Sequence, residues 1–315
     1  MVHLWVRAEE RPAERRVGIT PEGVAELRRR GFRVTVEDSP SRAIPTAEYA
    51  AAGAEIAPAG SWREAPAEAI IFGLKELPDD GTPLRHRHVM FGHAFKGQPD
   101  APRLLGRFRA GGGVLYDLEY LTDEQGRRIA AFGRWAGFAG AAVGLMAWIA
   151  QQAGPDPLAG PIEPRESSRA LLAELEAALA PIRARGVAPP RVMIIGALGR
   201  VGSGAGELAD ALGLEVTRWD QAETAHGGPF PEILEHEIFV NSILARPGVP
   251  VFVGPEALAA PRRLSVIADV SCDPGSDYNP VPVYERPTSF AEPVIRVADG
   301  SPPLDVMAID NLPSL

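Results

Sequence analysis

The sequence predicts an α/β protein of two Rossmann-like domains, with mostly parallel sheets and an interdomain cleft. Short apolar runs alternate with helical stretches, which is typical of βαβ units. The 315 residues suffice for about two domains of roughly 150 residues each. A second α/β series begins after Pro189 and Pro190. We therefore expect a first domain over residues 1–134 and a second over 135–315, which ends in a C-terminal return segment.

The first third of the chain predicts alternating helices and strands. Proline in the first turn and Gly31 as a stop indicate a helix over 20–30, followed by a strand at 32–37. A further helix is expected at 47–52. Three apolar runs have the composition of buried parallel strands, and they cover residues 69–73, 88–92 and 113–117.

The longest uncharged apolar run, 135–150, carries glycines at 137, 140 and 144. It is shorter than the roughly 20 residues that a membrane-spanning helix needs, so it predicts a core helix with close-packed small residues.

A Pro/Gly-rich linker at 155–164 leads into a helix that precedes the second series. Apolar residues at helical spacing predict an amphipathic helix over 168–183. A strand at 191–195 leads into a glycine-rich turn and a helix that ends near Leu212. Further strands are expected at 215–219, 238–241 and 264–270.

Charge and cysteine content restrict the partners. Acidic residues outnumber basic ones 41 to 32, giving a net charge of −9, which argues against a nucleic-acid or anionic-membrane partner. The single cysteine, Cys272, cannot form an internal disulfide, and the N-terminus shows no signal-peptide pattern. We expect a cytoplasmic protein with a small-molecule substrate; the sequence does not determine its oligomeric state, and a monomer is consistent with it.

The glycine-rich turn predicts a dinucleotide site. Gly196, Gly199 and Gly202 connect a strand to a helix, and such a turn lets backbone amides approach a pyrophosphate. Asp220 ends the next strand, where a carboxylate binds the adenine-ribose hydroxyls and repels a 2′-phosphate. NAD is therefore favoured over NADP. The alternative is a tight turn followed by a surface aspartate.

Two neighbouring strands of the first half each lead to an ionisable group. Residues 69–73 lead to Lys75 and Glu76, and residues 88–92 lead to His93. An amine and an imidazole at one sheet edge suit proton transfer near neutral pH. Of the 32 basic residues only Lys75 and Lys96 are lysines. The alternatives are a solvated lysine and a hydrogen-bonded loop histidine.

The sequence also contains candidate residues for two further kinds of site. Arg16 and the pair Arg127–Arg128 are candidates for binding carboxylates, because a guanidinium grips a carboxylate at two points. His86, His88 and His93 lack suitable acidic partners nearby, so no metal site is expected.

Many segments, in order along nearly the whole chain, resemble the NAD-dependent saccharopine dehydrogenase (L-lysine-forming) family, which is related to alanine dehydrogenase. The matching segments are Arg7-Ala-Glu9, Glu14-Arg-Arg16, Ile19-Thr-Pro21, Val36-Glu-Asp-Ser-Pro40, Pro58-Ala-Gly-Ser-Trp62, Gly73-Leu-Lys-Glu76, Leu115-Tyr-Asp-Leu-Glu119, the stretches 125–133 and 136–142, Ile194-Ile-Gly-Ala-Leu-Gly-Arg200, Gly227-Gly-Pro-Phe230 and the stretch 309–315.

The resemblance implies oxidation of the secondary amine that links lysine to glutarate, with hydride passing to NAD. Water then splits the imine into lysine and 2-oxoglutarate. By resemblance, Lys75 takes the proton of the secondary amine and His93 serves as acid–base for water attack. Arg16 and Arg128 would bind substrate carboxylates, and the site would also include Glu76, Lys96, Gln98, Phe132, Ser271, Cys272 and Asp273. NAD would contact Arg127, Gly199, Arg200, Asp220, Thr224, Leu244, Val270, Ile309, Asp310, Asn311 and Leu312.

The chain departs from the family pattern at a few positions. Val201 and Ser242 stand where the fungal type has a cysteine pair, Leu244 replaces an aromatic residue, and Asn311 replaces a histidine. The printed sequence ends at Leu315, where the family continues. The alternatives are an amino-acid dehydrogenase of alanine type, a related opine dehydrogenase, or a non-catalytic NAD-binding module.

Overall fold

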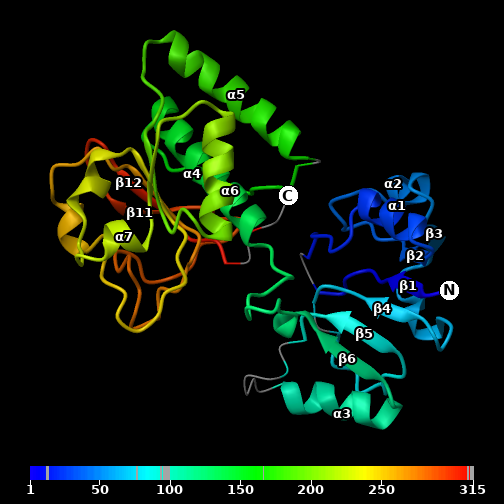
Figure 1. Cartoon of the computed structure of the whole chain (residues 1–315). Helices are drawn as coiled ribbons and strands as arrows, with labels where there is room; N and C mark the ends of the chain where they lie inside the picture. The colour runs from blue at the N-terminus through cyan, green and yellow to red at the C-terminus, as the bar shows by residue number, and fades with distance from the viewer. Residues whose placement is uncertain are drawn as a thin grey trace. The chain divides into compact units, whose positions relative to one another are not determined.

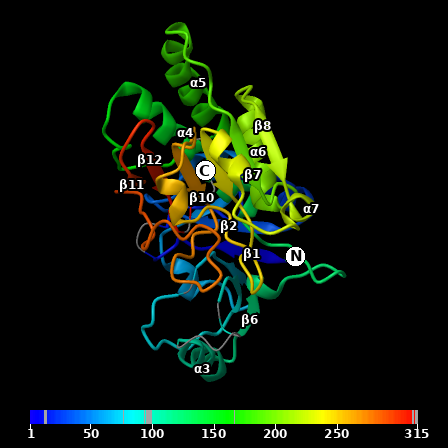
Figure 2. The same cartoon turned by 90° about the vertical axis from the view of Figure 1, so that its left-hand side faces the viewer.

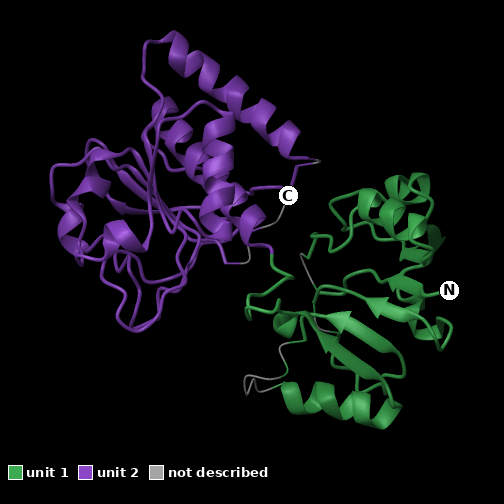
Figure 3. Cartoon of the chain, in the orientation of Figure 1, with its two compact units in different colours: residues 1–131 green, residues 132–315 purple. Residues whose placement is uncertain are grey.

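The computed structural model describes residues 1–11, 14–75, 77–92, 94, 100–165, 167–310 and 312 (Figure 1). The chain divides into two compact units, residues 1–131 and 132–315, which Figure 3 colours separately. Both units are α/β with mostly parallel sheets, so the predicted fold class is confirmed. Phe132, which lies before the predicted boundary at Arg134, belongs to the second unit.

The sheet of unit 1 has six parallel strands in the order β3-β2-β1-β4-β5-β6. Its centre is β1, whose Val6 lies opposite Val36 on one side and Phe72 on the other. Sequence patterns missed β1 because it is short and includes the polar residue His3. The strands are β1 (His3–Val6), β2 (Arg33–Glu37), β3 (Glu55–Ala57), β4 (Ile70–Phe72), β5 (Arg87–Met90) and β6 (Val114–Asp117).

Helices cover both faces of this sheet. Thr20 caps the first of them, because its Oγ1 accepts a hydrogen bond from Gly23 N at 3.2 Å. One apolar cluster includes Val24 and Tyr49, and another includes Trp62 and Phe108. The helices are α1 (Pro21–Arg29), α2 (Thr46–Ala51) and α3 (Ala101–Gly111), with short 3₁₀ helices η1 (Ser61–Glu64) and η2 (Leu118–Tyr120).

The sheet of unit 2 also has six strands, in the order β11-β12-β10-β9-β7-β8. All neighbours are parallel except β11, which runs antiparallel to β12. The strands expected from the sequence are present, whereas β11 and β12 were not predicted. The strands are β7 (Val192–Ile195), β8 (Val216–Trp219), β9 (Ile238–Asn241), β10 (Val266–Asp269), β11 (Ile295–Ala298) and β12 (Leu304–Met307).

One face of this sheet is covered by three long helices, α4 (Gly133–Ala153), α5 (Ser168–Ala184) and α6 (Arg200–Ala211). Figures 1 and 2 show α5 beside α4. The buried face of α5 includes Leu175 and Leu179, as its amphipathic pattern predicts. The remaining short helices are α7 (Gln221–Thr224), η3 (Pro231–Glu235) and η4 (Pro255–Leu258).

Glycines bring α4 and α6 unusually close together. A Cβ atom at Gly137 would lie 1.8 Å from Val201 O, and one at Gly204 would lie 1.8 Å from Arg134 O. The prediction of a core helix with close-packed small residues is therefore confirmed. Within the described residues, no helix is long and apolar enough to cross a membrane.

Each sheet has a topological switch point, where neighbouring strands lead their connections to opposite sides. In unit 1 it lies between β1 and β4, and in unit 2 between β7 and β9. Ligands of open α/β sheets bind at the carboxyl ends of strands at such points.

Candidate active site and cofactor-binding site

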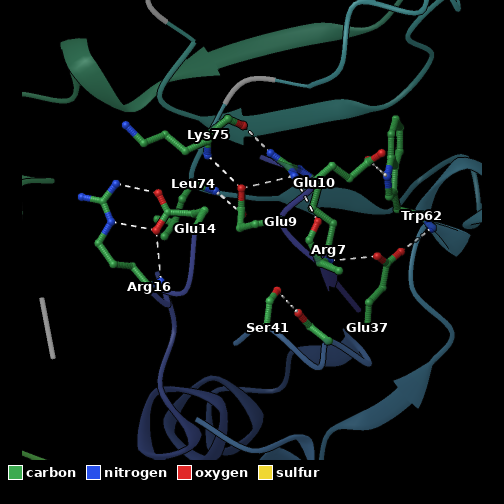
Figure 4. A network of polar contacts seen from close by, with 12 residues as sticks. Arg7, Glu9, Glu10, Glu14, Arg16, Glu37, Ser41, Trp62, Leu74 and Lys75 are labelled. Carbon is green, nitrogen blue, oxygen red and sulfur yellow. Dashed lines mark hydrogen bonds and ion pairs between the residues drawn. The ribbon is translucent and has the colours of Figure 1, made fainter. Parts of the chain in front are cut away.

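Lys75 lies at the switch point of unit 1, just beyond the end of β4. Two backbone hydrogen bonds fix the chain where it leaves β4: Gly73 N donates to Val89 O at 3.0 Å, and Phe91 N donates to Leu74 O at 2.9 Å. The Lys75 side chain is half-buried. Figure 4 shows it together with Arg16 and Glu14. The sequence thus located this lysine correctly at a strand end on the ligand-binding edge.

Arg16 uses two edges of its guanidinium on a neighbouring carboxylate. Its Nε donates to Glu14 Oε1 at 2.8 Å and its Nη2 donates to Glu14 Oε2 at 2.6 Å. Burial alone would raise the pKa of Glu14, but the hydrogen bonds and charge of Arg16, with a smaller effect of the Lys75 charge, lower that pKa. Lys75, Glu14 and Arg16 therefore form one electrostatic group.

The two neighbouring arginines, Arg127 and Arg128, bind different acidic partners. Arg127 is exposed and its Nε donates to Asp123 Oδ2 at 2.8 Å. Arg128 Nη2 lies 3.2 Å from Glu119 Oε2, and its guanidinium carbon lies 5.9 Å from the centre of the Phe91 ring. Because the backbone of Phe91 bonds Leu74, the structure brings Arg128 to the same sheet edge as Lys75.

Several predicted site residues lie outside the described residues. They are Glu76, His93, Lys96, Gln98 and Asn311.

Glu37, at the end of β2, occupies the position where a dinucleotide-binding sheet carries its ribose-binding carboxylate. In unit 1 this carboxylate is completely buried and accepts hydrogen bonds from Trp5 Nε1 at 3.0 Å and Ala8 N at 2.9 Å. It also accepts from Gly60 N and Trp62 N. Its hydrogen-bonding capacity is used inside the unit, so this carboxylate is not available to a nucleotide.

The glycine-rich turn of unit 2 follows β7 at the second switch point. Gly196 has φ +86°, in the left-handed region that favours glycine. A Cβ atom at Gly202 would lie 2.2 Å from Gly196 O, so only glycine permits this close turn. Gly199 and Arg200 are exposed at the start of α6, where the N-terminal backbone amides favour an anion.

Asp220 lies beside this turn, at the end of β8. Its Oδ2 accepts from Leu198 N at 2.9 Å, and its Oδ1 accepts from Gln221 N at 2.9 Å. Thr224 Oγ1 donates to Asp220 O at 2.9 Å. The structure therefore places Asp220 and Thr224 beside the glycine-rich turn, at whose end Gly199 and Arg200 begin α6.

The remaining predicted positions of unit 2 lie on loops that follow β9, β10 and β12. Leu244 is 74% exposed. The side chains of Ile309 and Leu312 are buried in the apolar core, so a cofactor would meet only their backbone. Val270 packs against the same core, whereas Asp310 and Asp273 are nearer the surface, and Phe132 precedes α4.

Sequence patterns missed a buried polar network behind the segment Ser271–Asp273. Asp269 accepts hydrogen bonds from Asn241 Nδ2 at 2.9 Å, Cys272 N at 3.0 Å and Tyr284 Oη at 2.7 Å. Cys272 has φ +37°, which is rare for a residue with a side chain. Ser271 Oγ donates to Ile243 O. These bonds hold the segment at the sheet edge. The sequence signal that could have indicated this network is Asp269, an aspartate at the end of the buried strand β10.

The network makes Cys272 a poor nucleophile. Burial and the negative charge of Asp269 raise the pKa of the Cys272 thiol to about 12, and its Sγ donates to Ala308 O at 2.9 Å. Burial also raises the pKa of the Asp269 carboxyl, against the opposing effect of its hydrogen bonds. The thiol therefore contributes shape and a hydrogen bond rather than a thiolate.

His86 and His88 are core residues of unit 1. His86 Nε2 lies 3.0 Å from Ala65 O, and the ring of His88 packs edge-on against Trp62 and Phe108. In the part of the chain that the structure describes, no group of three or more His, Cys, Asp or Glu residues could hold a metal ion.

Residues 5–139 match the family model "Alanine dehydrogenase/PNT, N-terminal domain". Over its whole length the chain shares its fold with a solved L-alanine dehydrogenase, with a TM-score of 0.63, 18% identity, and coverage of 99% of this chain and 84% of that one. At this identity the likeness concerns the fold alone.

Sequence relatives are much closer. Saccharopine dehydrogenase [NAD(+), L-lysine-forming] of Schizosaccharomyces pombe is 44% identical over 99% of this chain and 87% of its own length. The protein of the same name from Neurospora crassa is 46% identical over 99% of this chain and 85% of its own length. With such identity over almost all of both chains, and with the lysine and glycine-loop positions at the two switch points, this chain belongs to the saccharopine dehydrogenase (NAD+, L-lysine-forming) family.

Proposed function

We propose that this protein is an NAD-dependent oxidoreductase that cleaves saccharopine to L-lysine and 2-oxoglutarate, in a reaction that also runs in reverse as a reductive condensation. The bond oxidised is the CH–NH bond of the secondary amine. One observation carries this proposal: in a chain of this family, Lys75 lies at the switch point of the first sheet and the glycine turn with Asp220 lies at that of the second.

The residues of unit 2 fit NAD. The turn at Gly196–Gly202 admits no side chain at its close approach, and the exposed start of α6 presents backbone amides. The Asp220 carboxylate would accept hydrogen bonds from the adenine-ribose hydroxyls. Arg200, Thr224 and Leu244 would also contact the nucleotide. Bound NAD supplies an acceptor for hydride. Because Glu37 is already saturated by unit 1, the nucleotide is assigned to unit 2 alone.

The residues of unit 1 are assigned the proton work. Lys75 Nζ would accept the proton of the secondary amine. His93 would serve as acid–base for the attack of water on the imine.

Arg16 and Arg128 are assigned to substrate carboxylates. Each guanidinium is oriented by an acidic partner, Glu14 and Glu119 respectively. Substrate contacts are also proposed for Glu76, Lys96, Gln98, Phe132 and the segment Ser271–Asp273. The cytoplasmic location and the oligomeric state stay predictions.

An assay of NADH absorbance tests the function. We expect NADH to form when saccharopine and NAD are supplied. In the reverse direction, in a buffer free of ammonia, we expect NADH to be consumed when lysine and 2-oxoglutarate are supplied together. Turnover of alanine instead of saccharopine would assign the chain to the alanine type, and turnover of another opine would assign it to that substrate. NAD binding without hydride transfer to any of these substrates would make it a non-catalytic binding module.

A further inference from the structure

The run Arg7-Ala8-Glu9 has no part in the chemistry proposed above, yet it lies at the switch point of unit 1. It follows β1 directly, next to the end of β4. Figure 4 shows Arg7 and Glu9 around the backbone of Leu74 and Lys75.

The carboxylate of Glu9 receives two consecutive backbone amides. Leu74 N donates to Glu9 Oε1 at 2.7 Å, and Lys75 N donates to Glu9 Oε2 at 3.0 Å. Hydrogen bonds to an ionised acceptor are about twice as strong as neutral ones. Both oxygens of one side chain are thus directed at the peptide groups that precede Lys75.

Arg7 holds the other side of the same residue. Its Nη2 donates to Lys75 O, and its Nη1 lies 3.3 Å from Glu9 Oε2. The Arg7 side chain is 0% exposed. Gly73 makes room for it, because a Cβ atom there would lie 2.3 Å from Arg7 Nε. The ion pair therefore closes around both peptide groups of Lys75.

The ion pair is itself fixed to the sheet. Arg7 N donates to Phe72 O at 3.0 Å, which continues the pairing of β1 with β4. Ala8 N donates to the buried carboxylate of Glu37 at 2.9 Å. The backbone between Arg7 and Glu9 consequently has little freedom.

A buried ion pair is a weak source of stability, because desolvation of the two charges offsets most of their attraction. Here both charged groups bind the backbone of Leu74 and Lys75, just beyond the end of β4. These bonds add to the two backbone hydrogen bonds, from Gly73 N to Val89 O and from Phe91 N to Leu74 O, that already connect residues 73–75 to the neighbouring chain.

We propose that Arg7 and Glu9 are positioning residues that hold the backbone of Lys75 so that its amine has one fixed location at the ligand-binding edge. The inference rests on the proposed function, in which Lys75 accepts the proton of the substrate amine.

Glu9→Gln tests the inference with little change in shape. The amide keeps one acceptor, so one of the two backbone N–H groups loses its partner and Arg7 loses its counter-charge. We expect kcat with saccharopine to fall roughly 10- to 100-fold, the scale of a misplaced catalytic group, while the KM for NAD changes less than about twofold. Gly73→Ala, which displaces Arg7, is expected to act in the same direction.

Glu10→Gln is the matched control. Glu10 is the next carboxylate along the chain, but it lies near Trp62 and Arg63 instead, with distances of 3.3 to 3.5 Å. We expect it to keep the activity of the unmodified protein. Equal activities of Glu9→Gln and Glu10→Gln would overturn the inference.

A double variant separates positioning from a general structural effect. If Glu9 acts through Lys75, adding Glu9→Gln to Lys75→Met produces no further loss of kcat. Multiplicative losses would show that Glu9 acts elsewhere and would overturn the inference. The pH profile of kcat gives a further test. The inference is supported if the limb that reports the catalytic base shifts in Glu9→Gln but not in Glu10→Gln.

Amide hydrogen exchange at Leu74 and Lys75 provides a readout independent of activity. Faster exchange in Glu9→Gln than in Glu10→Gln supports the inference, and equal rates overturn it. An unmodified protein that does not oxidise saccharopine would refute the proposed function, and the exchange rates would still decide whether Arg7 and Glu9 hold Lys75.

Discussion

The carboxylate of Asp220 accepts hydrogen bonds from Leu198 N and Gln221 N, so it has a set position at the end of β8. A nucleotide on the glycine turn would place its adenine ribose next to this charge. A 2′-phosphate there would meet a like charge, which favours NAD over NADP.

We expect Asp220→Ser to raise the KM for NAD more than the KM for NADP. The substitution weakens the contact with the ribose hydroxyls of NAD, and it also removes the charge that repels the 2′-phosphate of NADP. Steady-state kinetics with both cofactors measure this. Asp210→Ser removes the same charge from the exposed side of α6, where Asp210 pairs with Arg218, and is expected to leave the preference unchanged. Equal kcat/KM for both cofactors in the unmodified protein would contradict the assignment.

The buried His88 makes the stability of the protein depend on pH. His88 is 1% exposed, and neither ring nitrogen has a hydrogen-bond partner among the described residues. Burial, together with the positive charge of Arg7, lowers the pKa of His88 from 6.5 to about 3. The unfolded chain takes up this proton below pH 6.5 and the folded chain does not, so stability present above pH 6.5 is lost as the pH falls toward 3.

We expect His88→Phe to remove this part of the acid sensitivity. At about pH 5 the lost contribution is roughly 2 kcal/mol, from about 1.4 kcal/mol per pH unit. Urea unfolding at about pH 5 and pH 8 measures the difference. The exposed His226, replaced by glutamine, is the control. If His88→Phe loses as much stability between the two pH values as the unmodified protein, the histidine is not the cause.

At the scale of elements, the contact of α4 with α6 depends on the absence of side chains. At Gly137 the nearest atom to an added Cβ is the backbone carbonyl of Val201, which cannot move without shifting α6. Because α6 begins at the glycine turn, the position of α4 also affects the nucleotide-binding edge.

We expect Gly137→Ala to lower the free energy of unfolding by about 1–3 kcal/mol, as overpacking does, and to weaken NAD binding. Gly106→Ala is the matched control, since Gly106 lies inside α3 with no atom within 4 Å of an added Cβ. That variant is expected to be more stable by roughly 0.5–1 kcal/mol. Denaturant unfolding and NAD titration measure both. A stabilised Gly137→Ala protein would contradict the packing argument.

At the scale of the whole molecule, the two units are assigned different tasks. Unit 1 holds Lys75, and hydrogen bonds inside that unit saturate the carboxylate of Glu37 at the end of β2, whereas unit 2 holds the glycine turn. The cleft predicted between the domains stays a prediction.

This division predicts that Lys75→Met lowers kcat by about 10²- to 10⁴-fold, the usual range for loss of general acid–base assistance, without weakening NAD binding. NAD titration by fluorescence and steady-state turnover of saccharopine measure the two effects separately. Arg15→Met, a basic residue on the exposed side of the same unit, is the control for a change of charge. Near-normal turnover in Lys75→Met would remove the lysine from the mechanism.

Local patterns were sufficient for most elements because caps, strand runs and glycine turns act over a few residues. Thr20 and Pro21 begin α1 as predicted, the run at 238–241 is β9, and the turn Gly196–Gly202 connects β7 to α6. The predicted strand ends also place Lys75 and Asp220 correctly, since parallel strands align their carboxyl ends.

The sequence by itself therefore determined the fold class, the family, the ligand-binding edges and the two most informative positions. Only the tertiary structure decided what surrounds them. Glu9 contacts Lys75, Glu37 contacts Trp62, and Asp269 contacts Tyr284 across long sequence separations. A local pattern treats each of these carboxylates as a surface charge, because burial of a charge requires partners that only the folded chain brings together.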